Sequence, residues 1–332
     1  MISAAVLAAV SLLALQGCAP AAPAEAVTST APVLSLPTAE HAYQSYLTAS
    51  DAAAAIGDQQ LALAVVTGVQ WTQVKSQYTA LATQGTPVPR YRYGTPRFYV
   101  PALAGYPEWF LVAVPRQTDA GGHLSAPVNT LMLFTRADTK AIWSLSGSAV
   151  LDQPLPPLAA DRNGYAVDVS TTDPSLLMRP DVVGATQAAV VDEGLASPAA
   201  AVVGGGSQTT GLYAAQAAQA RSQTARGLQY QWLLQGVPYP QFQLRTADGG
   251  ALTLYGMFLD VTTEHPNLAA GPPIPIPAAA VPVLAAPDEI GRHSVYVNWT
   301  YEFAAIDPPA TAPNAKIQVI ASQGVATYAQ AS

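Results

Sequence analysis

The sequence has a single cysteine, few charged residues and no basic residue ahead of its first long apolar run. Cys18 is the only cysteine among 332 residues, and charged residues make up 11%. One cysteine excludes an intramolecular disulfide, a multi-cysteine zinc site and a CxxC redox pair. The formal net charge is −7, and no basic patch of the kind that nucleic-acid binding requires is evident. We therefore expect no nucleic-acid partner.

Motifs for metal binding and nucleophilic catalysis are also missing. The histidines are His41, His123, His265 and His293. None of them has a partner at a ligand spacing such as H-x-x-x-H, so we expect no metal and no cofactor. Ser146-Gly147-Ser148 does not fit G-x-S-x-G, and the glycines at 204–206 lack the lysine of a phosphate-binding loop.

The N-terminal stretch predicts export. Ile2 to Leu15 is a nearly unbroken apolar run, too short for a comfortable membrane span of roughly 20 residues. It is typical of the apolar core of a signal peptide, here residues 1–17, although the usual basic residues before the core are absent. A misassigned start at Met1 would explain that absence. The alternative is a buried apolar helix followed by a chance cysteine.

The end of this run, Leu15-Gln16-Gly17-Cys18, resembles a bacterial lipobox. The resemblance implies that Cys18 receives a diacylglyceryl group on its sulfur and becomes the mature N-terminus. Two acyl chains give a stable membrane anchor where one would be marginal. We therefore expect a lipid-anchored protein on the extracytoplasmic face of the cell membrane.

Composition divides the rest of the chain into four segments. Residues 18–37 are rich in Ala, Pro, Ser and Thr and predict an extended tether. Residues 38–160 and 181–332 each carry helical and strand patterns and predict two domains. Residues 151–181 contain five prolines and no long periodic run, and residues 161–180 within them are predicted to form a linker.

Each predicted domain begins with helices and continues with strands. In the first, apolar spacing predicts helices over 39–56, with Thr38 as N-cap, and from Asp58 to Gly85. From Pro89 the side-chain pattern changes to a period of two, with arginine and tyrosine alternating over 90–93. Strands are predicted around 98–100 and over 109–114, 130–135 and 142–150.

The second predicted domain follows the same plan. Helices are expected over 182–195 and 209–234, and strands over 241–246, 252–262, 294–304 and 316–321, with a last one over 325–328. Helices followed by runs of strands indicate the α+β class, with helices on one face of an antiparallel sheet.

A repeated motif favours duplication. Residues 84–91 read QGTPVPRY and residues 235–242 read QGVPYPQF, so both fit Q-G-x-P-x-P-x-aromatic. Each copy is expected where a long helix meets the first strand, because Gly ends a helix and a following Pro prevents its continuation. The alternative is that such punctuation recurs in any helix-to-strand connection.

Two helices followed by a curved four-stranded sheet, twice over, resemble tandem cystatin-like or nuclear-transport-factor-2-like domains. The lipobox, the helix with Tyr43 and Tyr46, and the segments 98–101 and 106–110 also resemble uncharacterised lipoproteins of high-GC Gram-positive bacteria. The resemblance implies fold and location, and it implies no catalytic residue.

One polar and aromatic cluster is a candidate contact for a ligand or partner. It consists of Arg90, Arg92, Arg97, Tyr91, Tyr93 and Tyr99. Such a cluster can meet an anionic glycan or lipid headgroup through bidentate arginine contacts and ring stacking. The alternative is an edge strand whose positive charges discourage aggregation.

Three acids are candidates for acid–base chemistry in a pocket between sheet and helix. They are Asp51 on the first helix, Asp260, and Glu302 between Tyr301 and Phe303. Strand alternation places Glu302 on the face opposite the two aromatic residues, and it is also a candidate ligand contact. The same alternation allows a simpler interpretation, with the polar residue facing outward and the aromatic residues facing inward.

These observations favour a non-catalytic, membrane-anchored envelope lipoprotein that binds a ligand or serves as a scaffold. Its expected partner is a small apolar ligand or another envelope protein, in addition to the membrane contacted through Cys18. The alternative is an enzyme with an acid/base pocket in one domain.

Overall fold

The computed structural model describes residues 34–286 and 290–332. The predicted signal peptide, Cys18 and the tether up to residue 33 lie outside the described residues. Within them the chain has the expected α+β class, with five α-helices and one antiparallel sheet of 11 strands. No helix in the described ranges is long and apolar enough to cross a membrane.

The first helix, α1 (Leu36–Ile56), begins three residues before the predicted start. Ser35 is its N-cap, and the Ser35 hydroxyl accepts a hydrogen bond from the backbone N–H of Thr38. Thr38, the expected cap, therefore lies inside the first turn. The helix ends at Gly57, whose φ of 69° is left-handed and favours glycine.

The long helix predicted between Asp58 and Gly85 is two helices, α2 (Gln59–Leu63) and α3 (Gly68–Gln84). The prediction of one continuous helix was wrong because the intervening backbone pairs with a strand. Val66 forms a bridge to Leu145, and Thr67 N–H donates to the Leu145 carbonyl. A helical spacing of apolar residues does not reveal such a non-local pairing.

The strands of the first half are arranged as a meander with two short additions. They are β1 (Arg90–Tyr93), β2 (Arg97–Tyr99), β3 (Glu108–Ala120), β4 (His123–Leu124), β5 (Val128–Arg136) and β6 (Ser144–Leu151). The sheet order in this half is β1-β3-β5-β6, and β2 and β4 both pair with β3.

The described residues of the second half form two α-helices, four short 3-10 helices and five strands. The α-helices and strands are α4 (Pro180–Glu193), α5 (Thr210–Thr224), β7 (Gln229–Gly236), β8 (Phe242–Arg245), β9 (Ala251–Glu264), β10 (Ser294–Asp307) and β11 (Gln318–Ala331). The helix predicted over 209–234 was wrong beyond Thr224, where α5 ends, and residues 229–234 belong to strand β7. Gly227, with φ of 78°, separates α5 from β7, in which residues 229–233 alternate between exposed and partly buried.

The order of strands repeats between the halves. The second half reads β7-β9-β10-β11 with β8 on β9, which matches β1-β3-β5-β6 with β2 on β3. The two sets are joined edge to edge where β6 pairs with β11, Leu151 opposite Ala321.

The Q-G-x-P-x-P-x-aromatic motif does not follow this repeat. Its first copy follows α3 and precedes β1, whereas its second copy follows β7 and precedes β8. The two copies are therefore offset by one strand, and the expectation of matching helix-to-strand positions was wrong.

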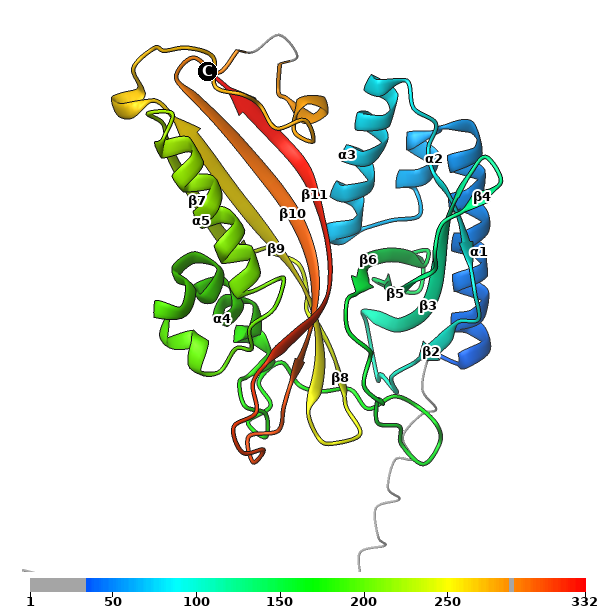
Figure 1. Ribbon diagram of the computed structural model, residues 1–332. Helices are drawn as coiled ribbons and strands as arrows, with labels where there is room; N and C mark the ends of the chain where they lie inside the picture. The colour runs from blue at the N-terminus through cyan, green and yellow to red at the C-terminus, as the bar shows by residue number, and fades with distance from the viewer. Residues whose placement is uncertain (1–33, 287–289) are drawn as a thin grey trace, which may run out of the picture. The chain divides into compact units, whose positions relative to one another are not determined.

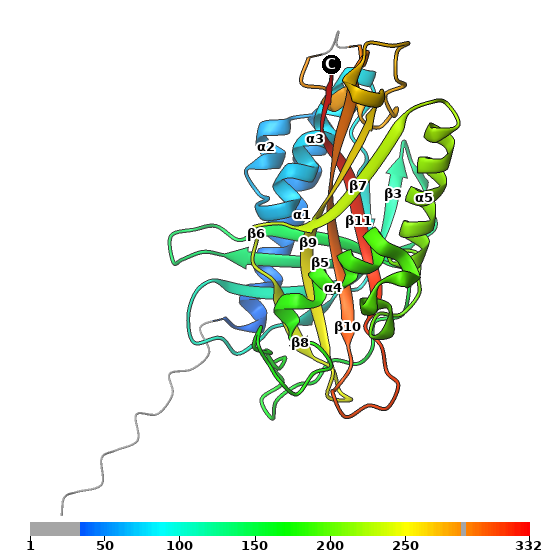
Figure 2. The ribbon, with the colours of Figure 1, turned by 90° about the vertical axis from the view of Figure 1, so that its left-hand side faces the viewer.

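Three of the apolar clusters among the described residues hold the layers together, and Figure 1 shows α1 beside β3 and α4 beside β9. In the first, α1 packs on one face of β3 and β5 through Tyr43, Phe110 and Phe134. The opposite face of β3 and β5 packs against β8, β9 and β11, so both faces of the first-half sheet are covered. In the third, α4 packs on the outer face of β9 and β10. Figure 2 shows β5 and β6 running across the direction of β9, β10 and β11.

Helix α3 belongs to the first half in sequence and also packs on strands of the second. The Gln73 side-chain amide donates to the carbonyl of Thr300 at 3.0 Å and to that of Gln323 at 3.2 Å. Figure 1 shows α3 alongside β11. This contact fixes α3 at a distance from α1, and a cavity lies in the space between them.

Candidate functional site

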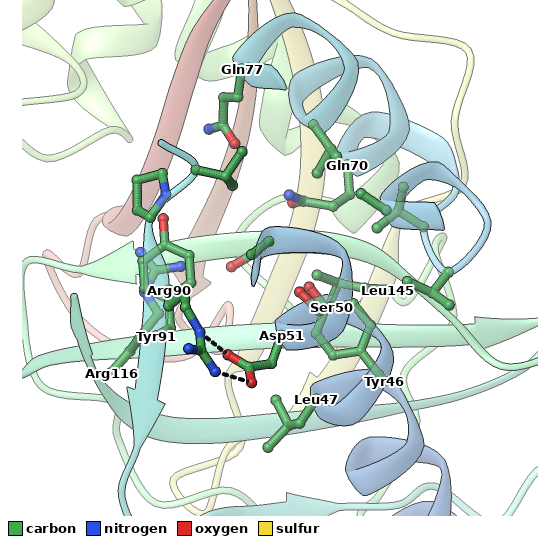
Figure 3. Close-up of a pocket in the computed structure, with 18 of the residues that line it drawn as sticks. Tyr46, Leu47, Ser50, Asp51, Gln70, Gln77, Arg90, Tyr91, Arg116 and Leu145 are labelled. Atoms are coloured by element: carbon green, nitrogen blue, oxygen red, sulfur yellow. Dashed lines mark hydrogen bonds and ion pairs between the residues drawn. The ribbon is translucent and has the colours of Figure 1, made fainter. Parts of the chain in front are cut away.

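A cavity of about 960 Å³ lies in the first half, between α1, α3 and the strands β1, β3, β5 and β6 (Figure 3). This volume is near the upper end of the range of about 300–1,000 Å³ that is typical of small-molecule sites. The lining residues used below are Tyr46, Asp51, Ala54, Gln70, Arg90, Tyr91, Arg92, Tyr93, Arg116, Met132 and Leu145, and Gln323 of β11 also reaches the lining.

The inner end of the cavity is apolar and buried. Met132 on β5 and Leu145 on β6 are each 2% exposed, and Tyr46 on α1 is 8% exposed. Burial raises the pKa of Tyr46 to about 12, so its hydroxyl stays neutral at physiological pH. A charged group would lose its hydration at this end without gaining a counter-ion.

Gln70 contributes a polar side chain to the inner end. Gln70 on α3 is 8% exposed, and its Oε1 atom makes no hydrogen bond with the described residues. Figure 3 shows Gln70 on the same side of the cavity as Leu145. Burying an acceptor without a donor costs about 1–3 kcal/mol. A ligand or water that donates a hydrogen bond here would remove this penalty.

The outer end of the cavity is charged and partly open to solvent. Arg90 on β1 holds Asp51 on α1 through two hydrogen bonds, from Nε at 2.7 Å and from Nη2 at 2.5 Å. Both side chains are 41% exposed. These hydrogen bonds hold the pKa of Asp51 below its ordinary value. Asp51 is therefore a structural carboxylate and is poorly suited to act as a general acid.

Two further arginines belong to the same end. Arg92 on β1 donates to Asp119 at 3.1 Å and is 55% exposed. Arg116 on β3 lies opposite Tyr93 in the sheet, and its guanidinium carbon is 4.7 Å from the centre of the Tyr91 ring. The Arg116 side chain forms no ion pair or hydrogen bond with the described residues.

The structure divides the predicted arginine and tyrosine cluster. Arg90, Tyr91, Arg92 and Tyr93 line the cavity. Arg97 and Tyr99 on β2 do not, and their side chains stack on one another with 5.9 Å between the guanidinium carbon and the ring centre.

Sequence reasoning missed Arg116 and Gln70. Arg116 lies beyond Pro115, outside the predicted strand over 109–114, although β3 continues to Ala120. Residues 116–119 are all polar and show no alternation of apolar and polar side chains, so no sequence signal indicated that the strand continues. No sequence pattern marked Gln70 as a site residue, because a glutamine within an amphipathic helix is ordinarily expected on the protein surface.

Glu302 does not line this cavity. It is on β10 opposite Gly256, on the other face from Tyr301 and Phe303, as alternation predicts. The outward, solvated position that alternation allowed was wrong, since Glu302 is 3% exposed. The opposite face of β10 is covered by the first half, and a methyl group on Gly147 of β6 would lie 2.7 Å from the Glu302 carboxyl carbon. Burial raises the pKa of Glu302 to about 8.

The remaining candidates have structural partners. Asp260 on β9 accepts hydrogen bonds from Tyr296, from Gln235 and, at 2.7 Å, from Asn298. His265 and His293 contact backbone carbonyls of Pro272 and Leu268, each at 2.9 Å.

No group of three or more potential metal ligands occurs in the described part of the chain.

Comparison with known proteins gives a family and a distant relative. The family described as "Domain of unknown function (DUF8094)" matches residues 30–331, across both halves. A protein of Streptomyces avermitilis named "Uncharacterized lipoprotein" is 24% identical over 250 residues, covering 70% of this chain and 71% of that protein. No solved structure matches the chain significantly. The expected similarity to uncharacterised lipoproteins is confirmed at this level.

Proposed function

The chain belongs to the DUF8094 family, and from that premise we propose that it is a non-catalytic, lipid-anchored envelope protein that binds a small ligand in the first-half cavity. The observation that carries this proposal is the cavity itself. It combines an apolar, buried inner end with the unpartnered Oε1 of Gln70. Small-molecule sites have this composition, with mostly apolar walls and a few polar groups that fix orientation.

The membrane anchor is proposed from two observations. Cys18 follows an apolar run with Leu15 and Gly17 at the lipobox positions, and a relative from Streptomyces avermitilis bears the name of a lipoprotein. The proposed location is the extracytoplasmic face of the cell membrane. Mass spectrometry of the protein from its native host should find an N-terminal Cys18 carrying a diacylglyceryl group. An unprocessed chain beginning at Met1 would contradict the proposal.

A tandem arrangement of cystatin-like domains is proposed for residues 38–160 and 181–332, with 161–180 as the connection. The repeated strand order, β1-β3-β5-β6 and β7-β9-β10-β11, supports it. The two halves differ in how closely a helix packs on the sheet. In the second half α4 lies directly on the sheet, where a Cβ on Gly184 would be 3.1 Å from both Tyr255 and Met257.

The enzymatic alternative has weaker support. Asp51, the acid that lines the cavity, is tied to Arg90 and keeps its charge. Glu302 has the raised pKa expected of a general acid, but it does not line the cavity. Catalysis needs an acid or base within hydrogen-bond reach of a bound substrate.

Binding of a neutral apolar fluorophore, N-phenyl-1-naphthylamine, tests the cavity. We expect saturable binding to the full chain carrying Cys18→Ser, so that no acyl group is attached. Ala54→Trp places an indole in the cavity wall of α1 and should weaken binding by about tenfold or more, as expected when most of the apolar contact is lost. Ser45→Trp, on the same helix but exposed and outside the cavity, is the matched control.

Equal binding to both tryptophan variants would contradict the proposal, because the fluorophore would then occupy another surface. Absence of binding to the parent chain would also contradict it. Native mass spectrometry of protein from its own host provides an independent check, since a bound ligand should appear as a reproducible mass increment that Ala54→Trp removes.

A further inference from the structure

The cavity changes character from one end to the other. Figure 3 shows Arg90, Tyr91 and Arg116 on one side, and Tyr46, Leu145 and Gln70 on the other. The arginine side is partly exposed, whereas the opposite side is buried. A ligand that fits both ends has a polar or charged head near solvent and an apolar part inside.

The sign of the charge at the open end is positive. Three arginines and one acid, Asp51, are the charged residues of the lining. Arg90 neutralises Asp51, and Arg92 is paired with Asp119, which lies outside the lining. Arg116 is left with no counter-ion among the described residues. This excess of positive charge contrasts with a net charge of −7 for the whole chain.

The setting of Arg116 suits an incoming anion. Its guanidinium stacks on Tyr91, which holds one face of the group and leaves its edge of N–H donors available. Guanidinium donors bind carboxylate and phosphate oxygens in a fork geometry, and such charge-assisted bonds are about twice as strong as neutral ones. A cationic head would meet repulsion from Arg116 and Arg92, and it would find Asp51 already occupied.

We propose that the ligand is an amphiphile with an anionic head, a carboxylate or phosphate, which Arg116 binds while the apolar part occupies the space lined by Met132 and Leu145. This inference rests on the proposed function, because it names the class of ligand for the same cavity. Gln70 Oε1 adds a preference for a hydrogen-bond donor, such as a hydroxyl group, along the apolar part.

Calorimetric titration with matched probes tests the proposal. The full chain carrying Cys18→Ser is titrated with dodecanoate, 1-dodecanol and dodecylammonium, each below its aggregation threshold, and with acetate as the head alone. We expect dodecanoate to bind about tenfold more tightly than 1-dodecanol, as expected for one charge-assisted contact near solvent. Dodecylammonium should bind more weakly than 1-dodecanol, and acetate should show no binding.

Substitution separates the role of Arg116 from that of charge in general. Arg116→Gln should weaken dodecanoate binding by about tenfold and leave 1-dodecanol unchanged, because the neutral probe makes no charged contact. Arg97→Gln is the matched control, since it removes the same charge from the same half at an exposed position outside the cavity. It should change neither affinity.

The outcomes distinguish this inference from the proposed function. If the fluorophore and 1-dodecanol bind but dodecanoate has no advantage, or Arg116→Gln and Arg97→Gln act alike, the anionic class is wrong and the cavity proposal stands. If no probe binds, the proposed function fails as well. Sedimentation with phosphatidylglycerol vesicles is a further arm. Arg116-dependent sedimentation without binding of monomeric dodecanoate would assign the arginine to a membrane headgroup and overturn the inference.

Discussion

Replacing Glu302 with Gln should stabilise the protein, and by an amount that depends on pH. Glu302 is 3% exposed on β10, has no hydrogen-bond or ion-pair partner among the described residues, and contacts Gly147 of β6. Burial without a partner penalises the ionised carboxylate, which raises its pKa from 4.5 to about 8. Glutamine has nearly the same size and cannot ionise.

The magnitude follows from the difference between the folded and unfolded pKa values. In the folded state Glu302 keeps its proton up to about pH 8, whereas in the unfolded state it loses the proton near pH 4.5. Between these values the unfolded state binds fewer protons, so the stability of the native protein falls as pH rises. The loss amounts to roughly 3 kcal/mol at pH 7 and roughly 5 kcal/mol above pH 8, as an order of magnitude.

Urea denaturation of both proteins at pH 4.5, 7 and 8.5 measures this effect. The difference in the free energy of unfolding should be small at pH 4.5 and grow with pH in favour of Glu302→Gln. Asp307, whose pKa burial raises to about 7, titrates in both proteins and cancels in the difference. Glu40→Gln, at an exposed position on α1, is the control and should show no pH-dependent gap. Parallel stability curves for parent and Glu302→Gln would refute the reasoning.

Two further substitutions test the packing around buried carboxyl groups. Gly147→Ala should destabilise the fold by about 1–3 kcal/mol, since its methyl group overlaps the Glu302 carboxyl; a melting temperature equal to that of the parent would contradict the close contact. Arg136→Met should cost about 3–5 kcal/mol, because it leaves Glu108, with a fully buried side chain, without its ion-pair partner. In urea denaturation, the double variant Arg136→Met with Glu108→Leu should recover much of the lost free energy of unfolding. If the double variant is no more stable than Arg136→Met alone, the loss does not come from the unpaired carboxylate.

Local sequence patterns predicted the elements well where the pattern and its terminators agree. Helix α1 ends at Gly57, and α4 and the strands β5, β8, β9 and β10 lie close to their predicted ranges. The two helix predictions that were wrong share one cause, which is pairing with a distant segment. The bridge from Val66 to Leu145 breaks a predicted helix, and β9 recruits residues 229–236 into a strand.

The candidate site was predicted in part for the same reason. The residues that line the cavity from β1 and α1, such as Arg90 and Asp51, stood out in sequence as a charged and aromatic cluster and as an acid on the first helix. Arg116 and Gln70 did not, because their significance depends on what lies across the cavity from them.

The sequence by itself determined the α+β class, the succession of helices and strands in each half, and the shortage of charge that leaves so few groups to form a site. The spacing of apolar residues and the positions of turn residues are local properties, so they can be recognised without a structure. Only the tertiary structure decided that the halves share one sheet, that both faces of β10 are covered so that Glu302 is buried, and that α3 stands away from α1 to leave a cavity with Arg116 at its open end. These features depend on which surfaces meet, and the period of an element indicates its apolar face without indicating what packs against it.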